Sequence, residues 1–195
     1  MAKDIDPIWI YTWPKRHAHV SAEKQIISCA KDYAGRTSKK EALDTLVQPL
    51  AIARGERGKP CFAGIADIHF SLSHSGSYVV CAFHGEPVGL DLQKHTPCKR
   101  ERIAGRFFHP DEYVFLEKRG FAGFFQVWAA KESYVKFTGT GITGAEGFRS
   151  FSVVAGDAMC SEANGVSYYH LDYADDYSLC LCAERIPSVA MTNLA

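Results

Sequence analysis

The distribution of hydrophobic and polar positions predicts a chain of short strands and amphipathic helices. Strand-like runs fall at residues 7–11, 68–72, 78–83, 88–92, 148–154, 167–172 and 177–183. Helix-compatible spacing falls at residues 21–33, 38–47 and 100–107, from His109 onward, and at 121–137, where Thr138 and Gly139 end the pattern. Because strands and helices cluster without strict alternation, the pattern favours an α+β fold.

Two pairs of similar segments indicate an internal duplication. Residues 7–11 resemble residues 87–91, and residues 77–82 resemble residues 176–181, so each half would begin and finish with a strand. Apolar strands also resemble one another by chance, and the similarity alone does not decide between these explanations. The division predicts an N-terminal lobe at residues 1–86, a C-terminal lobe at 87–186 and a tail at 187–195.

Composition excludes several classes of protein. The chain has 195 residues, of which 47% are hydrophobic and 23% charged, as in ordinary globular domains. Its 22 Lys and Arg balance 22 Asp and Glu, which argues against nucleic-acid binding because phosphate contacts need surplus cations. No apolar run approaches the roughly 18 residues of a spanning helix, so no membrane insertion is expected. Seven cysteines without a CxxC pair favour reduced thiols and a cytoplasmic protein.

Residues 88–93 place polar groups on one face of a predicted strand. Alternation turns the aliphatic side chains toward a core and Gly89, Asp91 and Gln93 toward the opposite face. A carboxylate and an amide oxygen at this spacing form half of a Mg²⁺ site, because that ion takes oxygen ligands and few carboxylates. The glycine lets another group approach the backbone. Taken alone, the pattern is explained more simply by a half-exposed strand.

The predicted helix at residues 121–137 carries a carboxylate on its apolar face. Glu132 shares that face with Phe121, Phe125 and Trp128. Burial of an unpaired carboxylate is costly, so Glu132 needs a cation, a metal ion or Lys136 one turn further on. A Glu132–Lys136 pair would explain a surface position. A carboxylate in an aromatic stripe favours a functional role instead.

Two shorter motifs precede these elements. The segment Ser73-His74-Ser75-Gly76 follows a strand and predicts a turn rich in hydrogen-bond donors, which suits a phosphate. The segment at residues 58–60, Gly-Lys-Pro, predicts a stiff loop that presents one cation. Either motif alone is weak evidence, because serine and glycine are common in turns.

In this order and at these separations, the four segments resemble the two-lobed, Sfp-type 4′-phosphopantetheinyl transferases. The pattern of that family is a GKP loop, a strand into SHSG, a VGIDIE-like strand and WxxKESxxKxxGxG. The matching segments here are residues 58–60, 73–76, 88–93 and 128–141, and residues 106–113 fit its RFF…EY segment. The resemblance covers roughly half of the chain, from about residue 58 to residue 154. It implies two similar α+β lobes related by a pseudo-two-fold axis, each a small, mainly antiparallel sheet packed with helices, with the active site at the lobe interface.

The resemblance also implies a reaction. The 4′-phosphopantetheine group of coenzyme A would move to a serine of an acyl or peptidyl carrier protein, with Mg²⁺ present and adenosine 3′,5′-bisphosphate released. Asp91, Glu132 and Lys136 are the expected catalytic residues, with Glu132 as the base for the carrier serine and Lys136 beside the diphosphate. The expected metal ligands are Asp91, Gln93 and Glu132. The expected coenzyme contacts are Lys24, Lys59, Pro60, Ser73, His74, Ser75 and Lys136.

The chain departs from the family pattern in three places. Gln93 stands where many relatives have Glu, which puts metal affinity or metal choice in question. A basic residue expected one turn after Lys24 is missing, and Lys31, Lys39 or Lys40 would have to replace it. The residues after Arg185 carry no motif that matches.

Partners and competing functions complete the prediction. A basic stretch beside the metal strand is a candidate docking face for an acidic carrier protein, although such a run is also typical of a solvated helix face; it contains Lys94, Lys99, Arg100, Arg102 and Arg106. A chain with two lobes supplies both sides of its own cleft, so we expect a monomer. Besides the active transferase, two readings stay open: a non-catalytic relative that binds coenzyme A or a carrier protein, and a metal-dependent phosphodiesterase.

Overall fold

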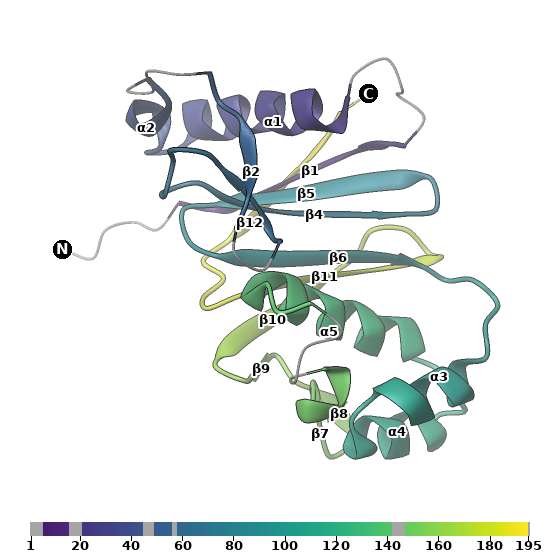
Figure 1. Cartoon of the computed structure of the whole chain (residues 1–195). Coiled ribbons are helices and arrows are strands. Elements are labelled where there is room, and N and C mark those ends of the chain that lie inside the picture. Colours follow the sequence, from purple (N-terminus) through teal and green to yellow (C-terminus); the bar gives the residue numbers. More distant parts are fainter. Residues whose placement is uncertain (1–5, 16–20, 45–48, 56–57, 142–146, 195) are drawn as a thin grey trace.

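The structure, a computed structural model, describes residues 6–15, 21–44, 49–55, 58–141 and 147–194. Its elements are stacked as helix, sheet, sheet and helix (Figure 1). The first sheet has the order β12 (Val189–Asn193), β1 (Ile8–Pro14), β5 (Tyr78–His84) and β4 (His69–Ser75). The second has the order β6 (Val88–Lys94), β11 (Tyr177–Ala183), β10 (Val166–Leu171) and β9 (Glu162–Ala163). All neighbouring pairs are antiparallel except β1 with β12, which confirms the predicted α+β class.

The two sheets share a core that lies between them. Alternate side chains of β1 and β5 meet those of β6 and β11, and nearly all are completely buried: Ile8, Ile10, Val80, Ala82, Val88, Leu90, Leu92, Leu179 and Leu181. Each large aliphatic side chain buried here stabilises the fold by roughly 1.5–3 kcal/mol. The prediction that the aliphatic face of residues 88–92 points into a core is therefore confirmed. The two halves of the chain are held together by this shared layer.

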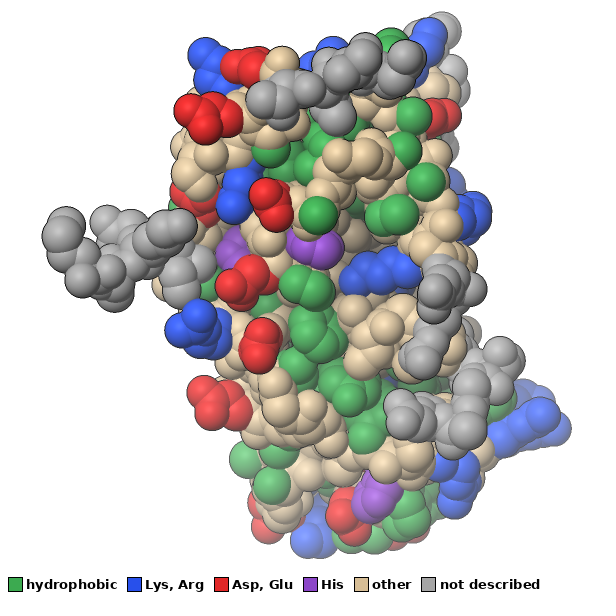
Figure 2. Space-filling model, turned by 60° about the vertical axis from the view of Figure 1, so that its left-hand side comes forward, with side chains coloured by type: hydrophobic (Ala, Val, Ile, Leu, Met, Phe, Trp, Pro, Cys, Tyr) green, Lys and Arg blue, Asp and Glu red, His purple; other side chains and the backbone are tan. Residues whose placement is uncertain are grey.

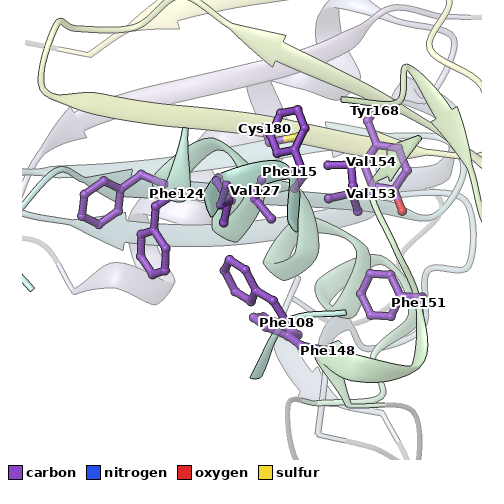
Figure 3. Packing of buried hydrophobic residues seen from close by; sticks show 14 of the residues in the cluster. Phe108, Phe115, Phe124, Val127, Phe148, Phe151, Val153, Val154, Tyr168 and Cys180 are labelled. Atoms are coloured by element: carbon purple, nitrogen blue, oxygen red, sulfur yellow. The ribbon is translucent and has the colours of Figure 1, made fainter. Parts of the chain in front are cut away.

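One long helix covers the outer face of each sheet. Helix α1 (Ala22–Arg36) begins at Ser21, whose hydroxyl accepts the backbone N–H of Lys24, and packs on the first sheet. Helix α5 (Phe124–Thr138) packs on the second sheet, above an aromatic cluster that includes Phe108 and Phe148 (Figure 3). None of the described helices is long and apolar enough to span a bilayer.

The remaining elements are short. They are α2 (Lys40–Asp44), β2 (Ile52–Arg54), β3 (Pro60–Phe62), α3 (Arg100–Phe107), α4 (Pro110–Glu117), the 3₁₀ turn η1 (Phe148–Ser150), β7 (Val154–Ala155) and β8 (Ala158–Met159). The start predicted at His109 is confirmed: its ring nitrogen accepts the N–H of Asp111, and Glu112 accepts the N–H of His109. The helix predicted at 38–47 is described only at Lys40–Asp44, because residues 45–48 lie outside the described residues.

Three sequence predictions differ from the structure. Residues 148–153 form η1 and an irregular stretch instead of a strand, which begins only at Val154 of β7, because Phe148 and Phe151 turn into the core around α5. Helix α5 begins at Phe124 instead of residue 121, since Phe121 and Gly123 both have positive φ, at 61° and 86°. The stretch expected to be a tail contains β12, which pairs with β1 from the first half of the chain.

Candidate active site

Three serines of β4 join the two sheets. The hydroxyl oxygens of Ser71, Ser73 and Ser75 accept the backbone N–H groups of Leu90, Leu92 and Lys94 on β6, at 2.9, 3.1 and 2.8 Å. Alternate side chains thus replace the backbone carbonyls that would normally bond neighbouring strands. The prediction that residues 73–76 form a turn is wrong for the first three, because β4 continues to Ser75 and the turn begins at Gly76. We refer to Ser71, Ser73 and Ser75 as the junction serines.

Ser73 also takes part in a buried polar group with Asp91 and Lys136. The Ser73 hydroxyl donates to Asp91 Oδ1 at 2.8 Å. Lys136 Nζ donates to the same oxygen at 2.6 Å and to Ser73 Oγ at 2.8 Å. Burial raises the pKa of Asp91 above its ordinary value, whereas Lys136 and Ser73 act in the opposite direction. The second carboxylate oxygen, Oδ2, is buried and has no hydrogen-bond partner within the described residues.

Glu132 lies one turn before Lys136 on α5 and is half-buried. The pKa of Glu132 is raised to about 7, mainly by burial and also by the nearby Asp91, whereas Lys136 acts in the opposite direction. Across the described ranges, Lys136 forms its ion pair with Asp91 and none is found between Glu132 and Lys136. The alternative of a simple intrahelical pair is therefore wrong. Glu132 remains a carboxylate whose pKa is close to neutral pH.

Gly89 explains how α5 reaches Asp91. A Cβ at this position would lie 1.9 Å from the backbone oxygen of Ser133 and 2.6 Å from the backbone nitrogen of Phe137. No side chain larger than hydrogen fits there, so the helix backbone rests directly on β6. The expectation that this glycine admits another group is confirmed, and that group is α5. The close crossing brings Glu132 and Lys136 over the strand that carries Asp91.

These residues line a cleft of about 640 Å³ whose wall comes from both halves of the chain. Eight of the predicted site residues belong to that wall: Lys59, Pro60, Ser73, His74, Asp91, Gln93, Glu132 and Lys136. Two do not: Lys24 is exposed on α1, and Ser75 points its hydroxyl at the β6 backbone. The apolar part of the wall includes Trp128 and Val135, which lie on the same face of α5 as Glu132.

Lys59 is held by the second half of the chain. Its ammonium donates to the backbone oxygens of Val88, at 3.1 Å, and Phe137, at 2.9 Å. The second of these lies in the last turn of α5, where carbonyl groups lack helical partners and attract cations. Burial lowers the pKa of Lys59 to about 8. Its described contacts are therefore with protein, and its contact with coenzyme A stays a prediction.

A buried ion pair beneath α5 was missed by the sequence analysis. Lys131 Nζ lies 2.7 Å from Glu112 Oε1, and both side chains are 0% exposed. The ammonium also donates to the backbone oxygen of Phe151, and the carboxylate accepts the N–H of Val153. Burial lowers the pKa of Lys131 to about 8. Because Lys131 points into the core, its neighbour Glu132 is turned toward the cleft.

The residues on the cleft wall suit a Mg²⁺ ion. Asp91 and Glu132 supply carboxylates, and Gln93 supplies an amide oxygen. The described part of the chain contains no group of three or more His, Cys, Asp or Glu side chains that could hold a metal ion. However, Asp91 Oδ2 is a buried carboxylate oxygen without a partner among the described residues, which is uncommon in proteins unless an ion or water completes it. An all-oxygen set with two carboxylates matches the preference of Mg²⁺.

Residues 87–182 match the family model of the 4′-phosphopantetheinyl transferase superfamily. The chain belongs to this superfamily. Among curated proteins it is similar to the 4′-phosphopantetheinyl transferase Sfp of Bacillus subtilis (strain 168), with 42% identity over 94 residues, or 45% of this chain and 41% of that protein. It is also similar to the 4′-phosphopantetheinyl transferase gsp of Aneurinibacillus migulanus, with 41% identity over 46% of this chain and 38% of that protein. In both cases the match spans less than half the length of the relative.

A weaker match to this superfamily extends over more of the chain. The 4′-phosphopantetheinyl transferase AcpT of Salmonella typhi is 29% identical over 171 residues, which is 85% of this chain and 82% of that protein. The segment matched by the family model, residues 87–182, contains Asp91, Gln93, Glu132 and Lys136. The matched segment of the superfamily therefore contains the carboxylates and the lysine that face the cleft.

Proposed function

We propose that this protein transfers the 4′-phosphopantetheine group of coenzyme A to a serine of an acyl or peptidyl carrier protein, as a holo-[acyl-carrier-protein] synthase. The reaction would require Mg²⁺ and release adenosine 3′,5′-bisphosphate. One observation carries the proposal: Asp91 on β6 and Glu132 and Lys136 on α5 meet in a cleft whose wall comes from both halves of the chain. The names of the superfamily relatives support the type of group that is transferred.

Asp91, Glu132 and Gln93 are the residues that would hold the ion. Bound there, Mg²⁺ would polarise the diphosphate of coenzyme A and offset the charge that grows on the leaving phosphate. Asp91 suits this role because Oδ2 has no partner in the described protein and Oδ1 is fixed by Ser73 and Lys136. Gln93 contributes no charge, so the protein itself would offer the ion two carboxylates and one amide oxygen.

Glu132 is suited to accept the proton of the carrier serine. In the transfer, the serine oxygen forms a bond to phosphorus, the bond from that phosphorus to the adenosine 3′,5′-bisphosphate oxygen breaks, and the serine proton passes to the base. A base acts best when its pKa lies near the working pH, and burial raises the pKa of Glu132 to about 7. Lys136 Nζ would donate to a phosphate oxygen from its position beside Asp91.

The coenzyme would lie along the wall made by the first half of the chain. His74 is exposed there, and Pro60 and the stem of Lys59 form the wall beside it. Lys24 and Ser75 are outside the described wall, so their contact with coenzyme A would require a longer reach or a rearrangement. Since one chain supplies both sides of the cleft, we propose a monomer. The seven cysteines are all free, which suits the reducing conditions of the cytoplasm.

The carrier protein would dock beside the metal strand. Lys99, Arg102 and Arg106 are exposed, and Phe107, whose ring lies against the Arg106 guanidinium, is 38% exposed. An exposed hydrophobic side chain on a helix that also carries exposed cations is complementary to an acidic protein surface with an apolar centre. In contrast, acidic and basic side chains are interspersed on the face shown in Figure 2, which offers no continuous basic track for nucleic acid.

The deciding experiment is intact-protein mass spectrometry of an apo carrier protein incubated with this protein, coenzyme A and Mg²⁺. A gain of one phosphopantetheine group, abolished by a chelator and by Glu132→Gln, would establish the reaction. If several unrelated carriers gain nothing while coenzyme A still binds, the protein is a non-catalytic relative. Release of phosphopantetheine in the absence of any carrier would identify a phosphodiesterase instead.

A further inference from the structure

Ser73 differs from the other junction serines in what its hydroxyl contacts. The hydroxyl oxygen of each junction serine accepts one backbone N–H group from β6. Ser73 in addition donates to Asp91 Oδ1 and accepts from Lys136 Nζ. A serine hydroxyl has one donor and two acceptor sites. All three sites of Ser73 are therefore occupied, by the strand, the carboxylate and the ammonium.

Because all hydrogen-bonding sites of the Ser73 hydroxyl are occupied, the orientation of the Asp91 carboxylate is fixed. The single proton of Ser73 points at Oδ1, because its two lone pairs already receive Leu92 N–H and Lys136 Nζ. Oδ1 in turn receives both the hydroxyl and the ammonium, and Oδ2 is left without a partner in the described residues. A rotation of the carboxylate would break two short bonds in a site where Asp91 is 5% exposed. Ser73 thus decides which oxygen of Asp91 is available to a ligand.

We propose that Ser73 is a positioning residue for the transfer. Its hydroxyl holds the Asp91 carboxylate and the Lys136 ammonium in fixed positions, so that Oδ2 of Asp91 is kept available for the metal ion. The inference rests on the proposed function, because it concerns the ligand oxygen of the same site. It assigns to Ser73 a task other than contact with coenzyme A. Partners that orient a ligand carboxylate in this way commonly change metal affinity by about 10- to 100-fold when removed.

The chain supplies a matched control for this role. Ser71 lies two residues earlier on the same strand, is 5% exposed like Ser73, and accepts a β6 N–H in the same way. Ser71→Ala and Ser73→Ala should therefore each remove one junction bond to β6. Only Ser73→Ala should also leave the Asp91 carboxylate free to rotate, because it removes the hydroxyl that donates to Oδ1.

The experiment is a titration of the full chain with Mn²⁺, followed by the electron paramagnetic resonance signal of the free ion. Mn²⁺ prefers the same oxygen ligands as Mg²⁺. We expect Ser73→Ala to weaken Mn²⁺ binding by about tenfold or more, Ser71→Ala to change it by less than about twofold, and Ser73→Thr, which keeps the hydroxyl, to recover most of the loss. Should Ser73→Ala fail to fold, Ser73→Cys fills the same volume with a weaker hydrogen-bonding group and should show the same loss.

Equal effects of the two alanine variants, or an unchanged affinity in Ser73→Ala, would overturn the role of Ser73. Asp91→Asn separates this result from a failure of the proposed function. If Asp91→Asn abolishes Mn²⁺ binding while both serine variants behave alike, the metal site stands and only the inference fails. If Asp91→Asn binds Mn²⁺ as well as the unchanged protein, the metal assignment fails, and the inference with it.

Discussion

Replacement of Glu112 by Gln should destabilise the protein more than any surface charge change. Glu112 and Lys131 are both 0% exposed and lie 2.7 Å apart, and Glu112 also accepts two backbone N–H groups, from Val153 and His109. Glutamine keeps the shape and one acceptor oxygen, but it removes the charge and directs an NH₂ group at one of the two N–H donors. The variant therefore leaves the Lys131 ammonium buried without a counter-charge.

Two separate arguments give a similar loss in the free energy of unfolding. Removal of one partner from a buried ion pair typically costs about 3–5 kcal/mol. Alternatively, the variant can release the Lys131 proton, and deprotonation at pH 7 of a lysine whose unfolded pKa is about 10.4 costs about 5 kcal/mol. The lost N–H acceptor adds about 1 kcal/mol. We expect a free energy of unfolding lower by about 4–6 kcal/mol, against a typical total of about 5–15 kcal/mol.

The measurement is equilibrium unfolding in urea followed by circular dichroism, at pH 7 and at pH 9. In the variant, the unfolded chain binds more protons at Lys131 than the folded chain, so stability must rise with pH over this interval. The deficit should shrink by about 1 kcal/mol between the two pH values, because Lys131 of the unchanged protein, with a pKa of about 8, also loses its proton over part of this interval. The control is Asp157→Asn, which breaks the Lys118–Asp157 pair, with side chains 58% and 70% exposed, and should cost less than about 1 kcal/mol.

The reasoning about this pair is refuted by either of two results. One is a Glu112→Gln protein that unfolds within about 1 kcal/mol of the unchanged protein at pH 7. The other is a deficit that stays constant from pH 7 to pH 9, because a buried ammonium without a partner cannot be insensitive to pH.

Three further predictions concern α5 and the cleft. Gly89→Ala should lower the melting temperature by roughly 5–10 °C, because its Cβ would lie 1.9 Å from the helix backbone. The control is Gly35→Ala, whose Cβ would have no described atom within 4 Å and which should leave the melting temperature unchanged or raise it. Equal effects of the two variants in calorimetry would contradict the close crossing. Because the pKa of Glu132 is raised to about 7, its carboxyl group is mostly protonated below that pH. The kcat/KM for transfer should therefore rise with pH from about 6 and level off above about 8. A flat profile would exclude Glu132 as the base. Lys136→Met should tighten Mn²⁺ binding about tenfold while slowing transfer, because it removes a positive charge that lies beside Asp91 and repels a metal ion at Oδ2. Weaker binding in the titration would show that orientation of the carboxylate by Lys136 outweighs this repulsion, and would contradict the prediction.

The sequence was sufficient to predict the direction of a side chain where the period of its own strand or helix determines that direction. Strand alternation correctly separated Asp91 from the aliphatic core face, and helical spacing placed Glu132 and Lys136 on one face of α5. The glycine that permits the close crossing also had a local signal, since Gly89 interrupts an otherwise apolar strand. For these positions, the direction of a side chain depends mainly on its own element.

Contacts between distant segments were beyond such reasoning. Nothing near Ser73 in the sequence indicates that its neighbour in space is β6, so a strand was taken for a turn. Lys131 was left without a role because the partner that justifies its burial, Glu112, belongs to another helix. Residues 148–154 have the composition of a strand, yet the backbone groups of Phe151 and Val153 bond to that ion pair instead of to a sheet. In each case tertiary contacts overrode the local preference.

The pairing of β1 with β12 sets an order for the assembly of the protein during its synthesis. Ile8 aligns with Val189, so β1 is made about 180 residues before β12, the strand that completes the described first sheet. By then the ribosome has already produced every strand of the second sheet. Until that moment one edge of β1 presents unpaired backbone groups, which invite pairing with other chains. Substitutions in residues 189–193 should therefore lower the yield of folded protein far more than the activity of the molecules that do fold, since none of these residues lines the cleft.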